Sequence, residues 1–178
     1  GTDFTHIIHC AAKSSPWGRI QEFYLANVQS TKNLIALGRK SKIENFVFIS
    51  TPSIYFNFKD RLNIKESDLL PSKLVNEYAK TKYQAEQEIK ASGLPFVVLR
   101  PRAIIGRGDS VIMPRLIRGQ KEGRLKIIGK GKNEADLTSV ENIVHAIELA
   151  LNPPTKAQNQ DFNITNGEST KLWEVISE

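Results

Sequence analysis

Short apolar runs alternate with longer segments of helical periodicity along this chain, and this alternation constrains the fold more than any other feature. Three runs, residues 6–11, 46–49 and 96–99, have the length and the aromatic and β-branched content of buried strands. Strand–helix–strand units with this spacing build parallel sheets with helices packed on them. The sequence therefore predicts an α/β fold, a parallel sheet with helices on both faces.

Apolar residues recur at helical spacing in four segments: 18–42, 74–92, 112–119 and 140–151. A glycine and a following proline, Gly93 and Pro95, end the second segment, and Pro153 ends the last, because proline cannot continue a helix. Two more short strands are expected at residues 125–128 and 162–164.

The composition fits a globular chain with its own core. Of the 178 residues, 40% are hydrophobic and 25% are charged, which excludes a disordered chain. The one cysteine, Cys10, excludes an intrachain disulfide and a cysteine-rich zinc site, and no metal is predicted. No apolar run is long enough for a membrane span and no signal peptide is visible, so a cytoplasmic protein is expected. The start at Gly1 instead of Met suggests a piece of a longer protein.

Positive charge is concentrated in residues 100–132, where ten lysines and arginines stand against Asp109 and Glu122. This stretch contains no Phe, Tyr or Trp on which bases could stack, so no nucleic-acid partner is predicted. Two interpretations stay open. The stretch is either a solvated face or a surface that faces an anionic substrate or cofactor.

Tyr78 and Lys82 lie four residues apart in a predicted helix, so they share one face. A phenol is a poor base at neutral pH, but a neighbouring ammonium group favours the phenolate and lowers the phenol pKa. Such a pair suits proton transfer to or from an alcohol or carbonyl oxygen. Tyr55 and Lys59 have the same spacing, but they enter a polar loop where the two side chains need not meet, so the first pair is favoured.

Small polar and apolar residues follow the first two predicted strands. Ser50, Thr51 and Ser53 come directly after the second strand, and ligands of open α/β sheets bind beyond the carboxyl ends of the strands. Ala11 and Ala12 end the first strand. Their small side chains suit either a flat ring close to the backbone or tight packing of a helix on the strand.

Six motifs in this order resemble the extended short-chain dehydrogenase/reductase superfamily, which includes the NAD-dependent epimerases and dehydratases. They are His9-x-Ala-Ala, Asn27-Val-Gln-Ser-Thr31, Phe48-Ile-Ser-Thr51-Pro-Ser-Ile-Tyr55, Tyr78-x-x-x-Lys82, Leu99-Arg-Pro101 with Gly106, and Asp136-Leu-Thr-Ser-Val140. Residues 100–109, 113–117 and 123–129 are similar to the 3β-hydroxysteroid dehydrogenase-like branch. The resemblance implies a Rossmann-like sheet, with residues 1–101 as the C-terminal half of a dinucleotide-binding domain. Residues 102–178 would be mainly a substrate-binding region that returns to the sheet near 136–164.

The resemblance also implies NAD or NADP as cofactor and a role for several residues. Tyr78 would be the catalytic acid/base, Lys82 its pKa-lowering partner and a ligand of the nicotinamide ribose, and Thr51 the hydroxyl that holds the substrate oxygen. Asn27 would support the lysine through water. The implied cofactor-binding residues are Cys10, Ala11, Ala12, Lys13, Ile49, Ser50, Tyr78, Lys82, Pro101, Ala103 and Ile104. The implied substrate-binding residues are Thr51, Pro52, Ser53, Arg102 and Arg107.

Departures from the family pattern narrow the function. The glycine-rich turn G-x-x-G-x-x-G is absent, so the first strands of the parent fold are expected to be missing and this piece alone is expected to be inactive. Pro52 and Ser53 stand where dehydratases carry Asp-Glu, and Ala103 and Ala135 replace polar ligands of a nucleotide sugar. An apolar alcohol or ketone is therefore the expected substrate.

The prediction is an NAD(P)-dependent oxidoreductase that interconverts a secondary alcohol and a ketone, with a homodimer as an option. A nucleotide-sugar epimerase, in which the hydride returns to the other face of the sugar, is the alternative enzyme. A sensor or scaffold that only binds the cofactor is the alternative without catalysis.

Overall fold

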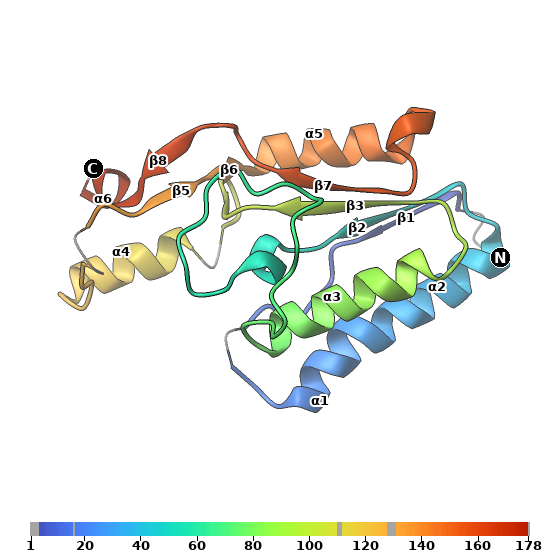
Figure 1. The fold of residues 1–178 in the computed structure, drawn as a ribbon, viewed down its shortest axis with the longest axis horizontal. Coiled ribbons are helices and arrows are strands. Elements are labelled where there is room, and N and C mark those ends of the chain that lie inside the picture. Colours follow the sequence, from blue (N-terminus) through green and yellow to red (C-terminus); the bar gives the residue numbers. More distant parts are fainter. Residues whose placement is uncertain (1–3, 16, 110–111, 128–130, 178) are drawn as a thin grey trace. The chain divides into compact units, whose positions relative to one another are not determined.

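A four-stranded sheet lies at the centre of the computed structural model, which describes residues 4–15, 17–109, 112–127 and 131–177 (Figure 1). Its order is β1 (His6–His9), β2 (Asn45–Ile49), β3 (Phe96–Pro101) and β7 (Gln160–Ile164). Strands β1, β2 and β3 run parallel. The predicted α/β fold with a parallel sheet is confirmed.

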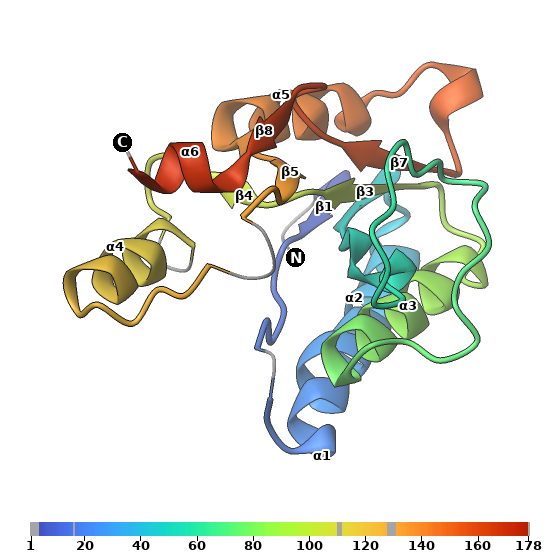
Figure 2. The same ribbon diagram turned by 60° about the vertical axis from the view of Figure 1, so that its left-hand side comes forward.

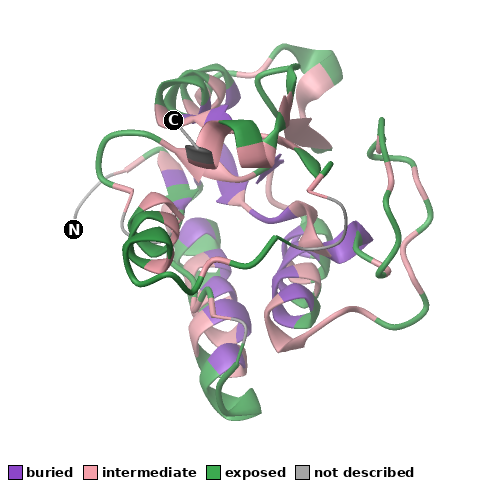
Figure 3. Cartoon of the chain, turned by 90° about the vertical axis from the view of Figure 1, so that its left-hand side faces the viewer, coloured by how far each residue is buried: buried purple, intermediate pink, exposed green. Residues whose placement is uncertain are grey.

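Helices cover the sheet because each contributes an apolar face. A continuous helical run, α1 (Ile20–Phe23), the π-helix η1 (Tyr24–Gln29) and α2 (Ser30–Ser41), lies beside α3 (Glu77–Lys90) on one face (Figures 1 and 2). The core between this helical layer and the sheet contains Ile35 of α2, Phe48 of β2 and Ile89 of α3. Figure 3 shows buried stretches on the strands and on the helices.

The end of α5 (Val140–Leu151) is tied to the first two strands. The Asn45 side-chain amide donates to the Ala150 carbonyl over 2.6 Å, and the His6 Nε2 lies 2.9 Å from the Leu151 carbonyl oxygen. No helix in the described part of the chain combines the length and apolar character needed to cross a membrane.

The chain divides into two compact units. The first contains residues 1–100 and 147–163 and includes the sheet, the 3-10 helix η2 (Pro52–Tyr55) and η3 (Thr155–Ala157). The second contains residues 101–146 and 164–178. Its elements are β4 (Ile104–Ile105) parallel to β6 (Thr138–Ser139), β5 (Glu134–Asp136) antiparallel to β8 (Ser169–Lys171), and the helices α4 (Met113–Lys121) and α6 (Leu172–Ser177).

The expected strand at 125–128 is wrong for residues 125–127, which are not in a strand, and Ile128 lies outside the described residues. The backbone N–H groups of Arg124 and Leu125 both donate to the Gly119 carbonyl at the end of α4, so this segment folds back on the helix. The four strands of the second unit were not predicted, because runs of two or three residues carry no readable periodicity.

Candidate active site

Lys82 is the most firmly held of the predicted site residues. Its side chain on α3 is buried, and its Nζ donates to the Ile49 carbonyl at the end of β2 over 2.6 Å. The same nitrogen lies 3.9 Å from the centre of the Phe48 ring, which attracts the cation. The packing of α3 on the sheet therefore fixes an ammonium group at the carboxyl end of β2, two residues before Thr51.

Burial lowers the pKa of Lys82 to about 8, although Glu86 and Cys10 act in the opposite direction. Below this pH the side chain carries a positive charge. An ammonium group has three N–H donors, and the Ile49 carbonyl takes one of them in the described part of the chain. The remaining donors suit the hydroxyl groups of a ligand.

Hydroxyl groups follow β2, as the sequence indicated. Thr51 is buried, and its Oγ1 accepts from the Ser53 backbone N–H over 3.2 Å and donates to the Ser53 Oγ over 3.1 Å, which caps η2. The Ser50 Oγ is buried and has no hydrogen-bond partner among the described residues. A buried hydroxyl without a partner is uncommon and is a good candidate for a ligand contact.

Tyr78 is the second residue of α3, where the chain first becomes helical. The Asn76 side chain accepts from the Ala79 backbone N–H over 2.9 Å and caps this helix, which explains why it begins at Glu77 and not at Leu74. Tyr78 is half-buried and lies one helical turn before Lys82. Its role as acid/base stays a prediction.

The competing pair, Tyr55 and Lys59, does not form such an arrangement. The Tyr55 ring is buried and its hydroxyl accepts from Arg100 Nη1 over 2.6 Å, whereas Lys59 is exposed. Burial raises the pKa of Tyr55, and the charge of Arg100 offsets this in part. Tyr55 therefore has a structural role and is poorly suited to acid/base catalysis.

Asn27 lies in the π-helix η1 and is buried. Its Oδ1 accepts from the Lys13 backbone N–H over 2.7 Å, and its Nδ2 donates to the Lys13 carbonyl over 3.3 Å and to the Thr81 Oγ1 over 2.9 Å. The side chain thus holds the loop after β1 against the turn of α3 that carries Lys82. The π-helical turn was not predicted from the helical spacing over 18–42, and such turns are often found at functional sites.

A buried histidine extends this network, and sequence reasoning gave it no role. The His9 Nε2 lies 2.9 Å from the Thr31 Oγ1, which itself donates to the Asn27 carbonyl over 2.6 Å. Because the Thr31 hydrogen is used in that bond, the His9 Nε2 carries the hydrogen and donates it. Burial and the charge of Lys82 lower the pKa of His9 to about 4, so the imidazole is neutral at pH 7.

The loop after β1 leaves small side chains at the surface. Cys10, Ala11 and Ala12 are exposed, and the Lys13 ammonium forms an ion pair with Glu22 at 2.8 Å. Partial loss of solvent around its sulfur raises the pKa of Cys10, and the charge of Lys82 offsets this in part. That a flat ring lies against these small residues stays a prediction.

The other predicted residues belong to different parts of the chain. Pro52 and Ser53 form the start of η2. The remaining ones are in the second unit, and their roles toward the first unit stay predictions: Pro101, Arg102, Ala103, Ile104 and Arg107. Arg102 and Arg107 are exposed.

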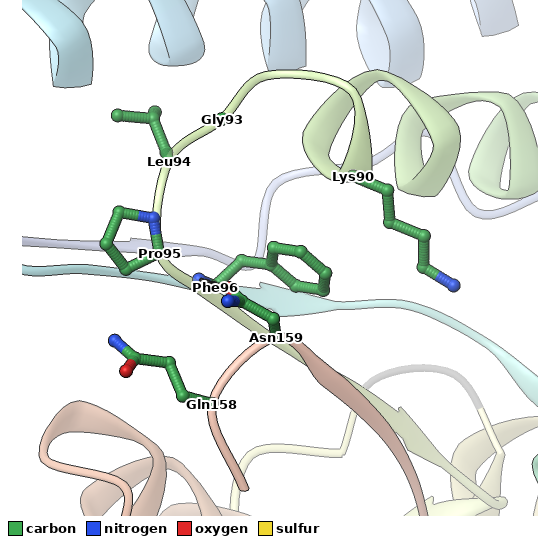
Figure 4. A pocket seen from close by; sticks show the side chains of 7 residues that line it. All are labelled: Lys90, Gly93, Leu94, Pro95, Phe96, Gln158 and Asn159. Carbon is green, nitrogen blue, oxygen red and sulfur yellow. Dashed lines mark hydrogen bonds between the residues drawn. The ribbon is translucent and has the colours of Figure 1, made fainter. Parts of the chain in front are cut away.

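One pocket beside the sheet lies away from these residues. A shallow, open pocket of about 370 Å³ lies at the amino end of β3, where Lys90, Pro95, Phe96 and Asn159 are among its lining residues (Figure 4). None of the predicted site residues lines it. Ligands of α/β sheets bind at the opposite, carboxyl end, so this pocket is not the candidate site.

Comparison with known proteins gives one family and several relatives. The NAD dependent epimerase/dehydratase family matches residues 1–165. A 2-alkyl-3-oxoalkanoate reductase of Stenotrophomonas maltophilia is 34% identical over 97% of this chain and 54% of its own length. A 3beta-hydroxysteroid-dehydrogenase/decarboxylase, isoform 2, of Arabidopsis thaliana is 37% identical over 97% of this chain and 33% of its own length. The chain thus spans about half the length of these relatives or less.

Solved structures agree with the fold. MoeE5 in complex with UDP-glucuronic acid and NAD is 27% identical and superposes with a TM-score of 0.81, over 97% of this chain and 60% of that one. The UDP-glucuronic acid 4-epimerase of Bacillus cereus, in complex with UDP-glucuronic acid and NAD, has a TM-score of 0.85 at 24% identity, over 98% of this chain and 58% of its own.

Proposed function

This chain belongs to the NAD-dependent epimerase/dehydratase family, and from that premise we propose that its protein is an NAD(P)-dependent oxidoreductase that interconverts a secondary alcohol and a ketone. The observation that carries this proposal is the hydrogen bond from the Lys82 ammonium to the Ile49 carbonyl. Lys82 lies one helical turn after Tyr78, and Ile49 lies two residues before Thr51. Relatives named as a 2-alkyl-3-oxoalkanoate reductase and a 3beta-hydroxysteroid-dehydrogenase/decarboxylase support an apolar substrate.

The residues of this chain fit the nicotinamide half of the cofactor. Within the part of the chain that the structure describes, the Ser50 hydroxyl is buried without a partner and one acceptor takes a single N–H of Lys82. The loop from Cys10 to Ala12 exposes small side chains after β1. We assign the ribose hydroxyls to Lys82 and Ser50. The glycine-rich turn that cradles the pyrophosphate in dinucleotide-binding domains does not occur in this sequence.

The proposed chemistry divides between the cofactor and three side chains. Bound NAD(P) supplies or accepts the hydride. Tyr78 gives a proton to the ketone oxygen or takes it from the alcohol, and the Lys82 ammonium lies one helical turn further along α3. The Thr51 hydroxyl holds the substrate oxygen. Asn27 keeps the loop after β1 and the second turn of α3 in place around this centre.

A nucleotide-sugar epimerase is the second candidate, because the similar solved structures are named as complexes with UDP-sugars and NAD. In that reaction the hydride returns to the sugar, so no cofactor is consumed. Ala103 and Ala135 favour the reductase, since they replace polar ligands that the family uses for a nucleotide sugar. Pro52 and Ser53 stand where dehydratases carry two acidic residues, which speaks against a dehydratase. A cofactor-binding sensor would have no use for the Tyr78–Lys82 pair.

The test uses the full-length protein with NADH or NADPH, a panel of 3-ketosteroids and 2-alkyl-3-oxoalkanoates, and UDP-glucuronic acid as the competing substrate. We expect net oxidation of the cofactor with a ketone. Tyr78→Phe should lower turnover by about 10²-fold or more while cofactor binding survives, because the ring stays and only the transferable proton is lost. Tyr83→Phe, which removes another half-buried phenol of α3, is the matched control. Near wild-type turnover of Tyr78→Phe, or epimerisation without net oxidation, would contradict the proposal.

A further inference from the structure

We infer that Arg100 is a positioning residue of this site, which holds the 3-10 helix after Thr51 and the helix of Tyr78 and Lys82 in a fixed register. The inference rests on the proposed function, because register matters only if these side chains act together. It concerns an arginine at the start of the basic stretch 100–132, for which the sequence left a solvated face and an anion-facing surface open. In the structure this side chain is buried at the end of β3, with 3% of its surface exposed.

The Arg100 guanidinium contacts three elements besides its own strand. Its Nε donates to Glu86 Oε1 over 2.9 Å and its Nη2 to Glu86 Oε2 over 2.6 Å, a bidentate pair with α3. Its Nη1 donates to the Tyr55 hydroxyl over 2.6 Å, which ties η2. Its Nη2 also donates to Asp161 Oδ2 on β7 over 2.7 Å. Few side chains other than arginine present several donors in a rigid plane of this kind.

These contacts close a ring of connections around the candidate site. Tyr55 is the last residue of η2, which begins directly after Thr51. Glu86 lies on α3 one turn beyond Lys82, and the Lys82 ammonium returns to the Ile49 carbonyl. The segment that carries Thr51 is therefore fixed to α3 on both sides of that residue. Before Thr51, the connection runs from Ile49 to Lys82. After Thr51, it runs from Tyr55 through Arg100 to Glu86.

The charges of the cluster balance. Glu86 is fully buried and Asp161 is largely covered, and they face Arg100 and the half-exposed Lys90, whose Nζ lies 2.5 Å from Asp161 Oδ2. Burial would lower the pKa of Arg100, but the hydrogen bonds and charges of Glu86 and Asp161 outweigh it and raise the pKa. The guanidinium stays charged, so its hydrogen bonds are strong and directional.

The decisive variant is Tyr55→Phe in the full-length reductase, because it removes one hydrogen bond and keeps the buried ring. We expect kcat to fall about tenfold with the KM for NAD(P)H within twofold, since small displacements of reacting groups are costly. Arg100→Lys should lower kcat further. Lys90→Met is the matched control: it removes an ion pair to the same Asp161 carboxylate without touching Tyr55 or Glu86, and we expect kcat within twofold of wild type.

A double variant separates positioning from general stability. If Arg100 couples Tyr55 to Glu86, Tyr55→Phe and Glu86→Gln break the same connection. The fold loss of kcat in the double variant should then be clearly smaller than the product of the two single losses. Independent effects that multiply would overturn the inference. So would a Tyr55→Phe enzyme with wild-type kcat. If Arg100→Lys does not fold, Tyr55→Phe and Glu86→Gln decide.

A measurement without catalysis keeps the two proposals distinct. We expect the amide hydrogens of residues 51–56 to exchange at least about tenfold faster in Tyr55→Phe and to be unchanged in Lys90→Met. Unchanged exchange in Tyr55→Phe would overturn the inference even in an inactive protein. Conversely, a protein that shows this exchange pattern and no reductase activity with any ketone contradicts the proposed function alone.

Discussion

Buried polar side chains decide the geometry of this site at the scale of single residues. His9, Asn27 and Lys82 are each 1–2% exposed, and each is bonded to backbone or side-chain atoms of another element. A buried polar group without a partner is costly, so such residues lock the elements that satisfy them. The loop after β1, the helical run and α3 are joined in this way.

The protonation of His9 predicts a pH dependence of stability. Its pKa is lowered from 6.5 to about 4 in the folded chain, so between these values the unfolded chain binds a proton that the folded chain does not. Stability therefore falls as the pH drops from about 6.5 to 4, by up to about 3 kcal/mol. Urea denaturation at pH 7 and pH 4.5 should show a smaller loss for His9→Gln than for wild type. An equal loss in both proteins would contradict this assignment.

The hydrogen bonds of Asn27 predict a contribution to stability at neutral pH. Asn27→Ala removes the side-chain partner of the Lys13 N–H and carbonyl, and it removes the donor to the Thr81 hydroxyl, which still donates to the Glu77 carbonyl. The free energy of unfolding should therefore fall by about 1–3 kcal/mol. Denaturant unfolding measures it. Asn33→Ala, an exposed position on α2, is the control and should stay within about 0.5 kcal/mol. An unchanged free energy of unfolding in Asn27→Ala would contradict this prediction and show that water replaces the amide.

At the scale of elements, helix ends and helix irregularities place the reacting groups. The helix predicted over 74–92 runs from Glu77 to Lys90, because the Asn76 cap starts it three residues later. The helix predicted over 18–42 contains the π-helical η1, which carries Asn27. Both features affect the site, because Tyr78 lies in the first turn of α3 and Asn27 lies in η1.

The Asn76 cap gives a prediction at this scale. Asn76→Ala removes the acceptor of the Ala79 N–H, which should lower the free energy of unfolding by about 1 kcal/mol and fray the turn of Tyr78. Turnover of the full-length protein should fall more than cofactor affinity. Asn76→Asp keeps the cap and adds a favourable charge at the helix N-terminus, so it should behave as wild type. Equal turnover in Asn76→Ala and Asn76→Asp would count against a role for this turn.

At the scale of the whole molecule, the chain has two units and a sheet with β1 at one edge. The outer side of β1 has no strand neighbour among the described residues, and the Ile8 side chain is 46% exposed. In the proposal, the candidate residues of the first unit bind only the nicotinamide half of the cofactor. The open edge and this proposal both bear on what these 178 residues do in isolation.

The 178-residue chain should bind NAD(H) and NADP(H) only weakly. A dinucleotide is held chiefly by its pyrophosphate, on backbone N–H groups of a glycine-rich turn that this sequence does not contain. Titration calorimetry on the verified 178-residue chain checks this. A dissociation constant in the micromolar range or below would contradict the argument.

The edge strand predicts self-association. Open strand edges pair readily with other chains, and a lysine on an edge opposes this. We expect the 178-residue chain to elute as an oligomer in size-exclusion chromatography with light scattering, and Ile8→Lys to shift it toward the monomer. Ile117→Lys, which adds the same charge at an exposed position of α4, should not. A monomeric wild-type chain would refute the expectation.

The sequence alone determined the larger elements. Local periodicity, together with glycine and proline residues at element ends, predicts strands such as 96–99 and helices such as 140–151. It also identified Tyr78, Lys82 and Thr51 as candidates, since their order and spacing are local properties. The short strands of the second unit were not predicted, because a strand of two or three residues forms only by pairing with a segment far along the chain.

Only the tertiary structure decided which polar residues are buried and what satisfies them. Arg100 and Arg102 differ by two positions and look alike in the sequence, yet one bridges Glu86, Tyr55 and Asp161 in the interior and the other is exposed. The partners of Arg100 lie 14, 45 and 61 residues away. A charge can be buried only where such partners converge, and that convergence is a product of packing.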